Sequence, residues 1–407
     1  MRFIVSRNKL LEALQHARVV LSHSCKEMLG NNMIVFIPKE SNPKEMTVMA
    51  TDCYVWVEEV TELDEPVVDP RAFAVDSHVI IKAIKSLEEQ PLEFVIGEYQ
   101  LTVKHSFGSF MLPIAENAEE ILSINKPILN FDADDAIQFG QEAPGMKSIF
   151  SRLKCAMADD DLRPAMSGIC MNLTQEYADY VASDGHRLMR IRKDSVVKDG
   201  KTVEAQFIIP RNIVNMLLKL LPQTGNLVVS YIPKIEKQKT DGRVLTTRKA
   251  AVGIEIDGKI CVEFYPTDSL YPSYQKVIPS ACNLQITIER KKLMATINLL
   301  SLFDMARQKL VFRIKNGEMS VSSSDYDINM SAEGQLSCTM TDLNNQHLSD
   351  SLVFGVKHST IASVLNTMKS ENVVLNFTEQ GHAIVIQPVP QPDVEDVIAL
   401  VMPMMVN

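Results

Sequence analysis

The residues with the clearest chemical potential occupy consecutive positions: Ser183, Asp184, Gly185, His186 and Arg187. Serine, histidine and aspartate make up a hydrolytic triad, and Asp184 with His186 could be two ligands of a metal ion. A triad needs groups that converge from distant segments, whereas residues around one turn point apart. Two ligands without further His or Cys clustering also make an incomplete metal site. We therefore predict no catalytic residue, no metal and no cofactor, and expect Asp184 to accept hydrogen bonds from its own turn.

The same turn marks a repeat. Asp184-Gly185 lies between apolar, strand-like flanks, which predicts a two-residue β-hairpin. Related triplets occur as Ala50-Thr51-Asp52 and Ser323-Ser324-Asp325, so the three aspartates are 132 and 141 residues apart. This regular spacing predicts one domain copied three times.

Helical periodicity has the same period as the aspartates. Apolar residues recur at helical spacing in two segments of each third of the chain, and the second segments begin near 78, 211 and 358. We predict helices over 6–22, 77–88, 142–157, 210–221, 290–303 and 358–369. Strand-like runs include 32–37, 46–60, 92–96, 99–105, 226–232, 250–257 and 260–265. The patterns predict an α+β protein with domains at 1–130, 131–281 and 282–407, and a link at 114–132.

Length and composition favour a globular protein without membrane segments. A chain of 407 residues suits about three domains. The first residues carry no apolar signal-peptide core, and no apolar run approaches membrane-spanning length. The cysteines are odd in number and include no CxxC pair, which favours reduced thiols in the cytoplasm over disulfides or zinc. They are Cys25, Cys53, Cys155, Cys170, Cys261, Cys282 and Cys338.

Charge is segregated along the chain. The net charge is −10, yet the helical segments contain 15 Lys or Arg and one acidic residue, Glu12. The segments counted are 7–21, 78–87, 146–157, 211–221, 290–303 and 357–369. Surface helices ordinarily mix both signs, so this asymmetry predicts that the helices face an anion, with duplex DNA the obvious partner. The alternative is chance, because apolar faces leave few polar positions. The cations are sparse and aromatic residues few, which favours a protein that surrounds DNA and slides.

A basic stretch at 233–249 interrupts the second unit and has its own Asp-Gly at 241–242. It predicts a hairpin. Its charges are explained either by solvation alone or by contact with nucleic acid, and the sequence leaves both explanations open.

An ordered set of motifs covers the whole chain and resembles the bacterial sliding clamp, the beta subunit of the DNA polymerase III holoenzyme. The motifs are Met1-Arg2-Phe3-Ile4-Val5, Arg163-Pro164 with Gly168, Ser183-Asp184-Gly185-His186-Arg187-Leu188, Tyr271-Pro272-Ser273-Tyr274-Gln275-Lys276-Val277-Ile278-Pro279 and Val401-Met402-Pro403-Met404.

The resemblance implies a DNA clamp fold, in which each domain packs two helices on antiparallel sheets. It also implies a closed ring made by a head-to-tail homodimer, with the contact near 77–88 of one copy and near Leu299 and Leu300 of the other. Such a protein is a non-catalytic processivity factor. Its implied partners are double-stranded DNA, the replicative polymerase catalytic subunit, the clamp loader, and other polymerases and repair proteins that bind through short Gln- and Leu/Phe-containing peptides.

The family's peptide pocket, an apolar groove between domains 2 and 3, carries over residue by residue. Met and Leu side chains would adapt to different peptides, while His186 and Arg187 would donate hydrogen bonds. The implied pocket residues are Met166, Ser183, Gly185, His186, Arg187, Leu188, Pro272, Lys276, Val277, Leu400, Val401, Met402, Pro403 and Met404.

Family DNA contacts map onto Lys26 and Arg163. The helix faces themselves add Lys82, Lys85, Arg211, Lys219 and Lys369. The chain departs from the family at Ser183, Lys276, Thr360 and Met405, so the partner preference is less certain than the location of the pocket. A different class of function, a repeat-built protein scaffold that never touches DNA, shares the pocket but predicts that Lys-to-Glu changes on the helices have no effect.

Overall fold

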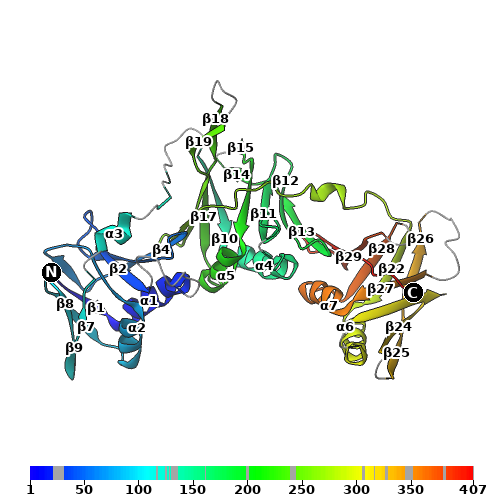
Figure 1. Ribbon diagram of the computed structural model, residues 1–407, viewed down its shortest axis with the longest axis horizontal. Coiled ribbons are helices and arrows are strands. Elements are labelled where there is room, and N and C mark those ends of the chain that lie inside the picture. Colours follow the sequence, from blue (N-terminus) through cyan, green and yellow to red (C-terminus); the bar gives the residue numbers. More distant parts are fainter. Residues whose placement is uncertain are drawn as a thin grey trace. The chain divides into compact units, whose positions relative to one another are not determined.

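The computed structural model describes residues 1–21, 32–115, 118–123, 126–127, 129, 136–160, 162–198, 201–238, 244–304, 308–315, 317–325, 329–343, 352–378 and 382–406. The contacts within the chain divide it into two compact units. Unit 1 combines residues 1–147 with 212–266, and unit 2 combines residues 148–211 with 267–407. Each unit therefore takes its strands from two separate stretches of the sequence (Figure 1).

The described elements follow one order three times: a strand, a helix, a run of strands, a second helix and further strands. The first copy contains β1 (Arg2–Ser6), α1 (Arg7–Leu21), β2 (Met33–Pro38), β3 (Glu45–Thr51), β4 (Val55–Glu62), β5 (Glu65–Val68), β6 (Phe73–Asp76), α2 (Ser77–Ser86), β7 (Pro91–Ile96), β8 (Gln100–His105) and β9 (Gly108–Pro113). A short helix, α3 (Ala118–Ser123), follows it.

The second copy adds two short hairpins to this order. It contains β10 (Ile137–Glu142), α4 (Ala143–Leu153), η1 (Lys154–Ala156), β11 (Gly168–Leu173), β12 (Tyr177–Ser183), β13 (Arg187–Asp194), β14 (Val197–Lys198), β15 (Lys201–Thr202), β16 (Ala205–Pro210), α5 (Arg211–Leu220), β17 (Asn226–Ile232), β18 (Ile235–Gln238), β19 (Val244–Arg248), β20 (Ala251–Ile256) and β21 (Ile260–Phe264). A single 3-10 turn, η2 (Tyr274–Lys276), lies between this copy and the next.

The third copy returns to the simpler order. It contains β22 (Leu284–Glu289), α6 (Arg290–Leu300), η3 (Ser301–Phe303), β23 (Lys309–Lys315), β24 (Glu318–Asp325), β25 (Met330–Ser337), β26 (Thr339–Asp342), β27 (Leu352–Lys357), α7 (His358–Thr367), β28 (Asn372–Phe377), β29 (Ile384–Val389) and β30 (Asp396–Val401).

Unit 1 is built on an eight-stranded sheet with the order β10-β17-β20-β21-β4-β3-β2-β6. Strands of the second copy meet strands of the first where β21 pairs with β4, and Val262 lies opposite Val57 at this junction. A five-stranded sheet, ordered β5-β1-β7-β8-β9, completes the unit. Its sheets are antiparallel throughout the described pairings.

Unit 2 repeats this arrangement with the second and third copies. Its nine-stranded sheet has the order β16-β11-β12-β13-β30-β29-β28-β22-β26, and a four-stranded sheet has the order β25-β24-β23-β27. The copies join between β13 and β30, where Leu188 lies opposite Leu400. Each of the two large sheets joins strands of two consecutive copies. The contacts within the chain therefore group it into two units. The domains 1–130, 131–281 and 282–407 each hold one copy of the element order, and their boundaries stay a proposal.

The repeated aspartates occupy equivalent hairpin turns. Asp52 Oδ1 accepts the amides of Tyr54 and Val55 at 3.0 and 2.9 Å, and Asp184 Oδ1 accepts those of His186 and Arg187, both at 2.9 Å. This pattern satisfies the turn amides locally, which is why Asp is favoured there. In the third copy, Asp325 ends β24, and residues 326–328 lie outside the described ones.

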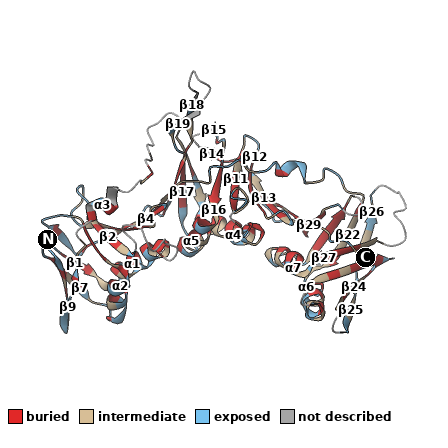
Figure 2. Cartoon of the chain, in the orientation of Figure 1, coloured by how far each residue is buried: buried red, intermediate tan, exposed pale blue. Residues whose placement is uncertain are grey.

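Apolar faces of the helices cover the sheets. In α5, Ile213, Val214, Met216, Leu217 and Leu220 are buried, the spacing of an amphipathic helix. Helix α1 packs against β3, β4 and α2, and α6 packs against β24, β25 and α7. Figure 2 shows the same division, with buried residues along the helix faces that meet strands.

The six predicted helices are all present, and none of the described helices is long and apolar enough to span a membrane. The strand-like run 46–60 is divided into a hairpin, β3 and β4, at the turn that holds Asp52 of the repeated triplet. Cys53 in this turn has φ +70°, and the turn contains neither Gly nor Pro, so the triplet is its main signal in the sequence. Strands β1, β5, β6 and β10 were not predicted, and α3 lies within the link predicted at 114–132.

Candidate functional site

The turn between β12 and β13 forms one end of an apolar groove. The Ser183 hydroxyl donates to the Arg187 carbonyl at 3.0 Å and accepts the Gly185 amide at 3.2 Å, while Asp184 accepts the turn amides and pairs with Arg187 Nε at 2.9 Å. Ser183 and Asp184 thus bond within their own turn, which confirms the prediction made for Asp184. The two side chains are not arranged as a nucleophile and an orienting acid, so the geometry gives no support to a hydrolase.

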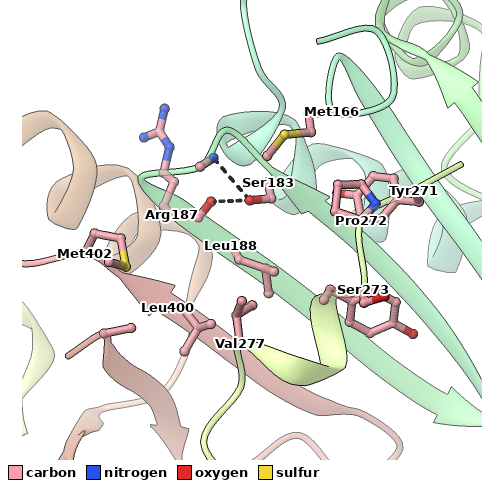
Figure 3. A pocket seen from close by; sticks show the side chains of 13 residues that line it. Met166, Ser183, Arg187, Leu188, Tyr271, Pro272, Ser273, Val277, Leu400 and Met402 are labelled. Atoms are coloured by element: carbon pink, nitrogen blue, oxygen red, sulfur yellow. Dashed lines mark hydrogen bonds between the residues drawn. The ribbon is translucent and has the colours of Figure 1, made fainter. Parts of the chain in front are cut away.

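The groove is a cavity of about 190 Å³ in unit 2. Its floor is the junction between the second and third copies, because Leu188 on β13 and Leu400 on β30 are directly opposite each other. The close-up in Figure 3 shows Leu188 between Met166 and Val277, with Leu400 next to Val277. The complete lining is Met166, Ser183, Gly185, Arg187, Leu188, Tyr271, Pro272, Ser273, Tyr274, Val277, Ala383, Leu400 and Met402. Such a lining suits apolar anchors of an extended ligand.

Strand alternation decides which C-terminal residues face the groove. Leu400 and Met402 line it, whereas Val401 between them is fully buried and points to the other face of β30. The Met402 amide donates to the His186 carbonyl at 2.8 Å, which fixes the chain end beside the turn. The groove thus depends on contacts between residues more than 200 positions apart.

Nine of the fourteen predicted pocket residues line the groove, namely Met166, Ser183, Gly185, Arg187, Leu188, Pro272, Val277, Leu400 and Met402. The other five, His186, Lys276, Val401, Pro403 and Met404, are not part of its lining. Met404 instead pairs with Gly355, its amide donating to the Gly355 carbonyl at 2.8 Å. Tyr271, Ser273, Tyr274 and Ala383 were missed. The first three belong to the motif at 271–279, and Ala383 has no signal in the sequence.

Two arginines hold the turn in place. Arg187 also donates to the Ser363 hydroxyl of α7, so the groove is tied to that helix. Arg163, predicted to contact DNA, donates to the Asp184 carbonyl at 2.9 Å and pairs with Asp160 at 2.6 Å. A Cβ at Gly185 would lie 3.0 Å from Arg163 Nη1, and Gly185 has φ +86°. Glycine therefore suits both the backbone and the close guanidinium.

The remaining predicted DNA-facing residues fall into three groups. Lys82, Lys85, Lys219 and Lys369 are exposed. Arg211 pairs with Asp159, so its charge is partly neutralised. Lys26 lies outside the described residues. The exposed lysines stay candidates for contact with phosphates.

Some helical cations serve the fold. In each copy, a basic residue in the first helix donates to a carbonyl at or just beyond the C-terminal end of the second helix, where carbonyls lack helical partners. The bonds run from Arg7 Nε to Ile84 O (3.0 Å), from Lys147 Nζ to Leu221 O (2.5 Å) and from Arg290 Nε to Ser370 O (2.8 Å). The helical charge count therefore overstates the charge available to DNA.

The predicted dimer contact needs one correction. Leu299 is 59% exposed, but Leu300 is 1% exposed and belongs to the core beneath α6. A surface contact therefore cannot use Leu300 directly. Two exposed apolar residues near the edge strand β9 were not predicted. Phe107 is 74% exposed beside this strand, and Met111 within the strand is also exposed. Exposed apolar side chains along a sheet edge mark a surface for pairing.

Of the positions that depart from the family pattern, Ser183 lines the groove, whereas Lys276, Thr360 and Met405 are not part of its lining. Thr360 is nearly buried in α7, while Lys276 and Met405 are exposed. The basic stretch at 233–249 forms the predicted hairpin, β18 with β19. Its Asp-Gly at 241–242 lies outside the described residues.

Titratable groups that could hold metal or react were also located. Among the described residues, Glu12, His16 and Glu59 place ligand atoms within 4.8 Å of one another, and His16 Nδ1 is 2.7 Å from Glu59 Oε2. This contact is a hydrogen-bonded ion pair, and the Glu59 carboxylate raises the pKa of His16. The described cysteines are free, and burial raises the pKa of Cys170 and of Cys261 to about 12, which makes both thiols unreactive.

Comparison with known proteins gives a consistent result. Residues 142–258 match the family model of the DNA polymerase III beta subunit, central domain. The chain is 21% identical to the beta sliding clamp of Pseudomonas putida over 396 residues, covering 97% of each chain, and 21% identical to that of Chlamydia pneumoniae over 325 residues, covering 80% of each.

Solved structures show the same fold along the whole chain. The DNA polymerase III subunit beta of Pseudomonas aeruginosa aligns with a TM-score of 0.83 at 18% identity, and the beta subunit of Thermotoga maritima aligns with a TM-score of 0.80 at 18% identity. Each alignment covers 100% of both chains. A further structure of the Pseudomonas aeruginosa protein is bound to griselimycin, with a TM-score of 0.83, 18% identity and full coverage of both chains.

Proposed function

We propose that the chain is a beta sliding clamp of DNA polymerase III, which surrounds duplex DNA as a non-catalytic processivity factor in the cytoplasm. It tethers the polymerase catalytic subunit, the clamp loader and repair proteins, all through the groove of unit 2. The observation that carries this proposal is the groove itself: an apolar cavity lined by Leu188, Leu400 and Met402, with Arg187 at its rim. Extended peptides with apolar anchors fit such a surface.

Two free sheet edges support a head-to-tail ring. Strand β9 is one edge of its five-stranded sheet, and β25 is one edge of its four-stranded sheet. Pairing β9 of one copy with β25 of another would satisfy both edges and cover the apolar side chains of Phe107, Met111 and Leu299. Because the two edges differ, the contact is head-to-tail, and it closes into a ring when the rotation between copies allows it.

Exposed lysines support a loose contact with DNA. Lys82, Lys85, Lys219 and Lys369 have solvated charges and could neutralise phosphates without reading the bases. We propose that enclosure by the ring, more than these few charges, retains DNA.

Retention on closed DNA tests enclosure. The protein loaded onto a nicked circle by its loader should stay bound, and it should be released when the circle is linearised. The double change Lys82→Glu and Lys85→Glu should shorten the retention on circles, because these lysines face phosphates. Equal retention on circles and linear DNA would overturn enclosure, and full retention of the double variant would favour a scaffold that never touches DNA.

Peptide binding tests the groove. The Met402→Ala change should weaken binding of a fluorescein-labelled Gln-Ala-Ser-Leu-Phe peptide about tenfold or more, because a methionine side chain that the bound peptide covers contributes roughly 1.5–3 kcal/mol. The control is Met404→Ala, which removes an exposed methionine from the same tail but outside the lining. Griselimycin, the ligand in the Pseudomonas aeruginosa structure, should compete with the peptide. Equal affinities of both variants, measured by fluorescence anisotropy, would remove the groove assignment.

A further inference from the structure

A row of polar residues crosses the nine-stranded sheet. Asn172 on β11 lies directly opposite Asp179 on β12, and Asp179 lies directly opposite Arg192 on β13. Directly opposite residues of antiparallel strands place their side chains on the same face of the sheet. The three side chains therefore form one row, and the groove residue Tyr274 contacts it through its hydroxyl.

Asp179 is the centre of this row. The residue is 0% exposed, and its carboxylate accepts two hydrogen bonds from Arg192, Nε to Oδ1 at 2.7 Å and Nη2 to Oδ2 at 2.8 Å. Arg192 in turn lies 3.5 Å from the centre of the Tyr177 ring. A buried carboxylate is tolerated when a bidentate guanidinium compensates its charge, so Asp179 is a fixed acceptor.

The fixed acceptor holds Tyr274. The Tyr274 hydroxyl donates to Asp179 Oδ2 at 2.7 Å and accepts from Asn172 Nδ2 at 2.9 Å. Burial raises the pKa of Tyr274, so the hydroxyl keeps the proton that it donates. The ring of Tyr274 packs with Leu188 and Leu400 and lines the groove. Its two hydrogen bonds therefore set the position of a groove surface.

Tyr274 belongs to a wall of the groove, residues 270–281, in which Tyr271 and Ile278 also pack on the apolar cluster beneath the groove. Backbone hydrogen bonds to strands are made just before the wall, by Thr267, and just after it, by Asn283. Within the wall they are local, such as the Lys276 amide to the Ser273 carbonyl at 3.2 Å. In Figure 3 the wall lines one side of the groove. The wall is therefore held by side chains, through the packing of Tyr271 and Ile278 and through the hydrogen bonds of the Tyr274 hydroxyl.

We propose that Asp179 is a positioning residue for peptide binding, which acts through Tyr274 to hold the wall 270–281 in the place where a peptide's apolar anchor can enter. The proposal rests on the proposed function of the groove. Without the Tyr274 hydroxyl, the wall occupies other positions, and the fraction of molecules ready to bind falls. Association then slows, while dissociation from the closed complex changes less.

The test compares Tyr274→Phe with the native chain. This change keeps the ring and the bidentate Asp179–Arg192 pair and removes only the hydroxyl. Affinity for the labelled Gln-Ala-Ser-Leu-Phe peptide should fall on the order of tenfold, because a hydrogen bond to a charged acceptor is lost. Most of the loss should appear in the association rate. In the free protein, amide hydrogen exchange should accelerate over 270–281 and stay unchanged in β11–β13.

Two further variants separate positioning from general damage. Tyr54→Phe removes the hydroxyl of an exposed tyrosine in the Asp52 turn of the first copy. It should change neither peptide affinity nor amide exchange. Asp179→Asn should weaken peptide binding, and adding it to Tyr274→Phe should cause little further loss, because both changes interrupt one interaction. Unchanged affinity and unchanged exchange in Tyr274→Phe would overturn the proposal, as would faster exchange throughout β11–β13. If the native chain binds no peptide, the proposed function fails, while exchange over 270–281 still decides whether Tyr274 holds the wall.

Discussion

The capping role of Arg7 gives a prediction whose size can be worked out from the structure. Its guanidinium donates to two carbonyls in the last turn of α2, Ile84 O at 3.0 Å and Lys85 O at 2.8 Å. Arg7→Met keeps the apolar stem and a similar helix propensity, so it isolates the guanidinium. One carbonyl is partly buried and one is exposed. A hydrogen bond to a charged group is worth about 1.5–3 kcal/mol when it is buried, and the interaction of the guanidinium with the helix dipole adds a few tenths. We therefore expect Arg7→Met to lower the free energy of unfolding by about 2 kcal/mol.

Urea unfolding followed by tryptophan fluorescence can measure this loss. Trp56 is the single tryptophan of the chain, and it is buried in β4 against which α1 packs, so its signal reports unit 1. The matched control is Lys9→Met on the same helix, where the pair of Lys9 with Glu62 is exposed on both sides. That control should cost well under 1 kcal/mol. Equal losses in the two variants would refute the capping argument.

Two more changes should lower stability, the second of them only at low pH. Arg152→Met should lower the free energy of unfolding by about 3–5 kcal/mol, because it leaves the mostly buried Glu395 without the partner that lies 2.6 Å away. The double variant that also carries Glu395→Met should recover most of that stability, as measured by thermal unfolding. The raised pKa of His16, caused mainly by its hydrogen bond to Glu59, stabilises the folded chain fully below about pH 6.5. This stabilisation should be lost as pH rises through the folded pKa, and His16→Gln should remove the slope reported by Trp56 fluorescence.

Local patterns in the sequence were sufficient for the helices and for the repeated turns. Apolar spacing in segments such as 211–220 predicts a helix wherever one face must be buried, and α5 buries that face as expected. The turn at Asp184 was also predictable, because Asp satisfies the amides of its own turn without help from distant residues. The turn at Asp52 carried the weaker signal, the repeated triplet alone, since Cys53 has a left-handed backbone there without a Gly or Asn.

Matching motifs to the family identified most residues of the groove but did not show which side chains face it. Nine of its predicted residues line the groove, and among them Leu400 and Met402 follow the alternation of β30. Val401 does not, although it belongs to the same motif, because it points to the opposite face of β30. A motif identifies the segment that forms the groove. The position of each residue on its strand then determines whether its side chain faces the groove and can contact a ligand.

The sequence by itself determined three copies of an α+β unit, the helices, the repeated turns and the neighbourhood of the groove, because short-range periodicity and turn chemistry are local. Only the tertiary structure decided that the large sheets cross between copies, that Leu300 belongs to the core, and that Arg7 caps a second helix. It also placed Asp179 against Tyr274, 95 residues away. These outcomes depend on which strands pair and in which register, and pairing is set by the packing of distant segments, which local patterns do not contain.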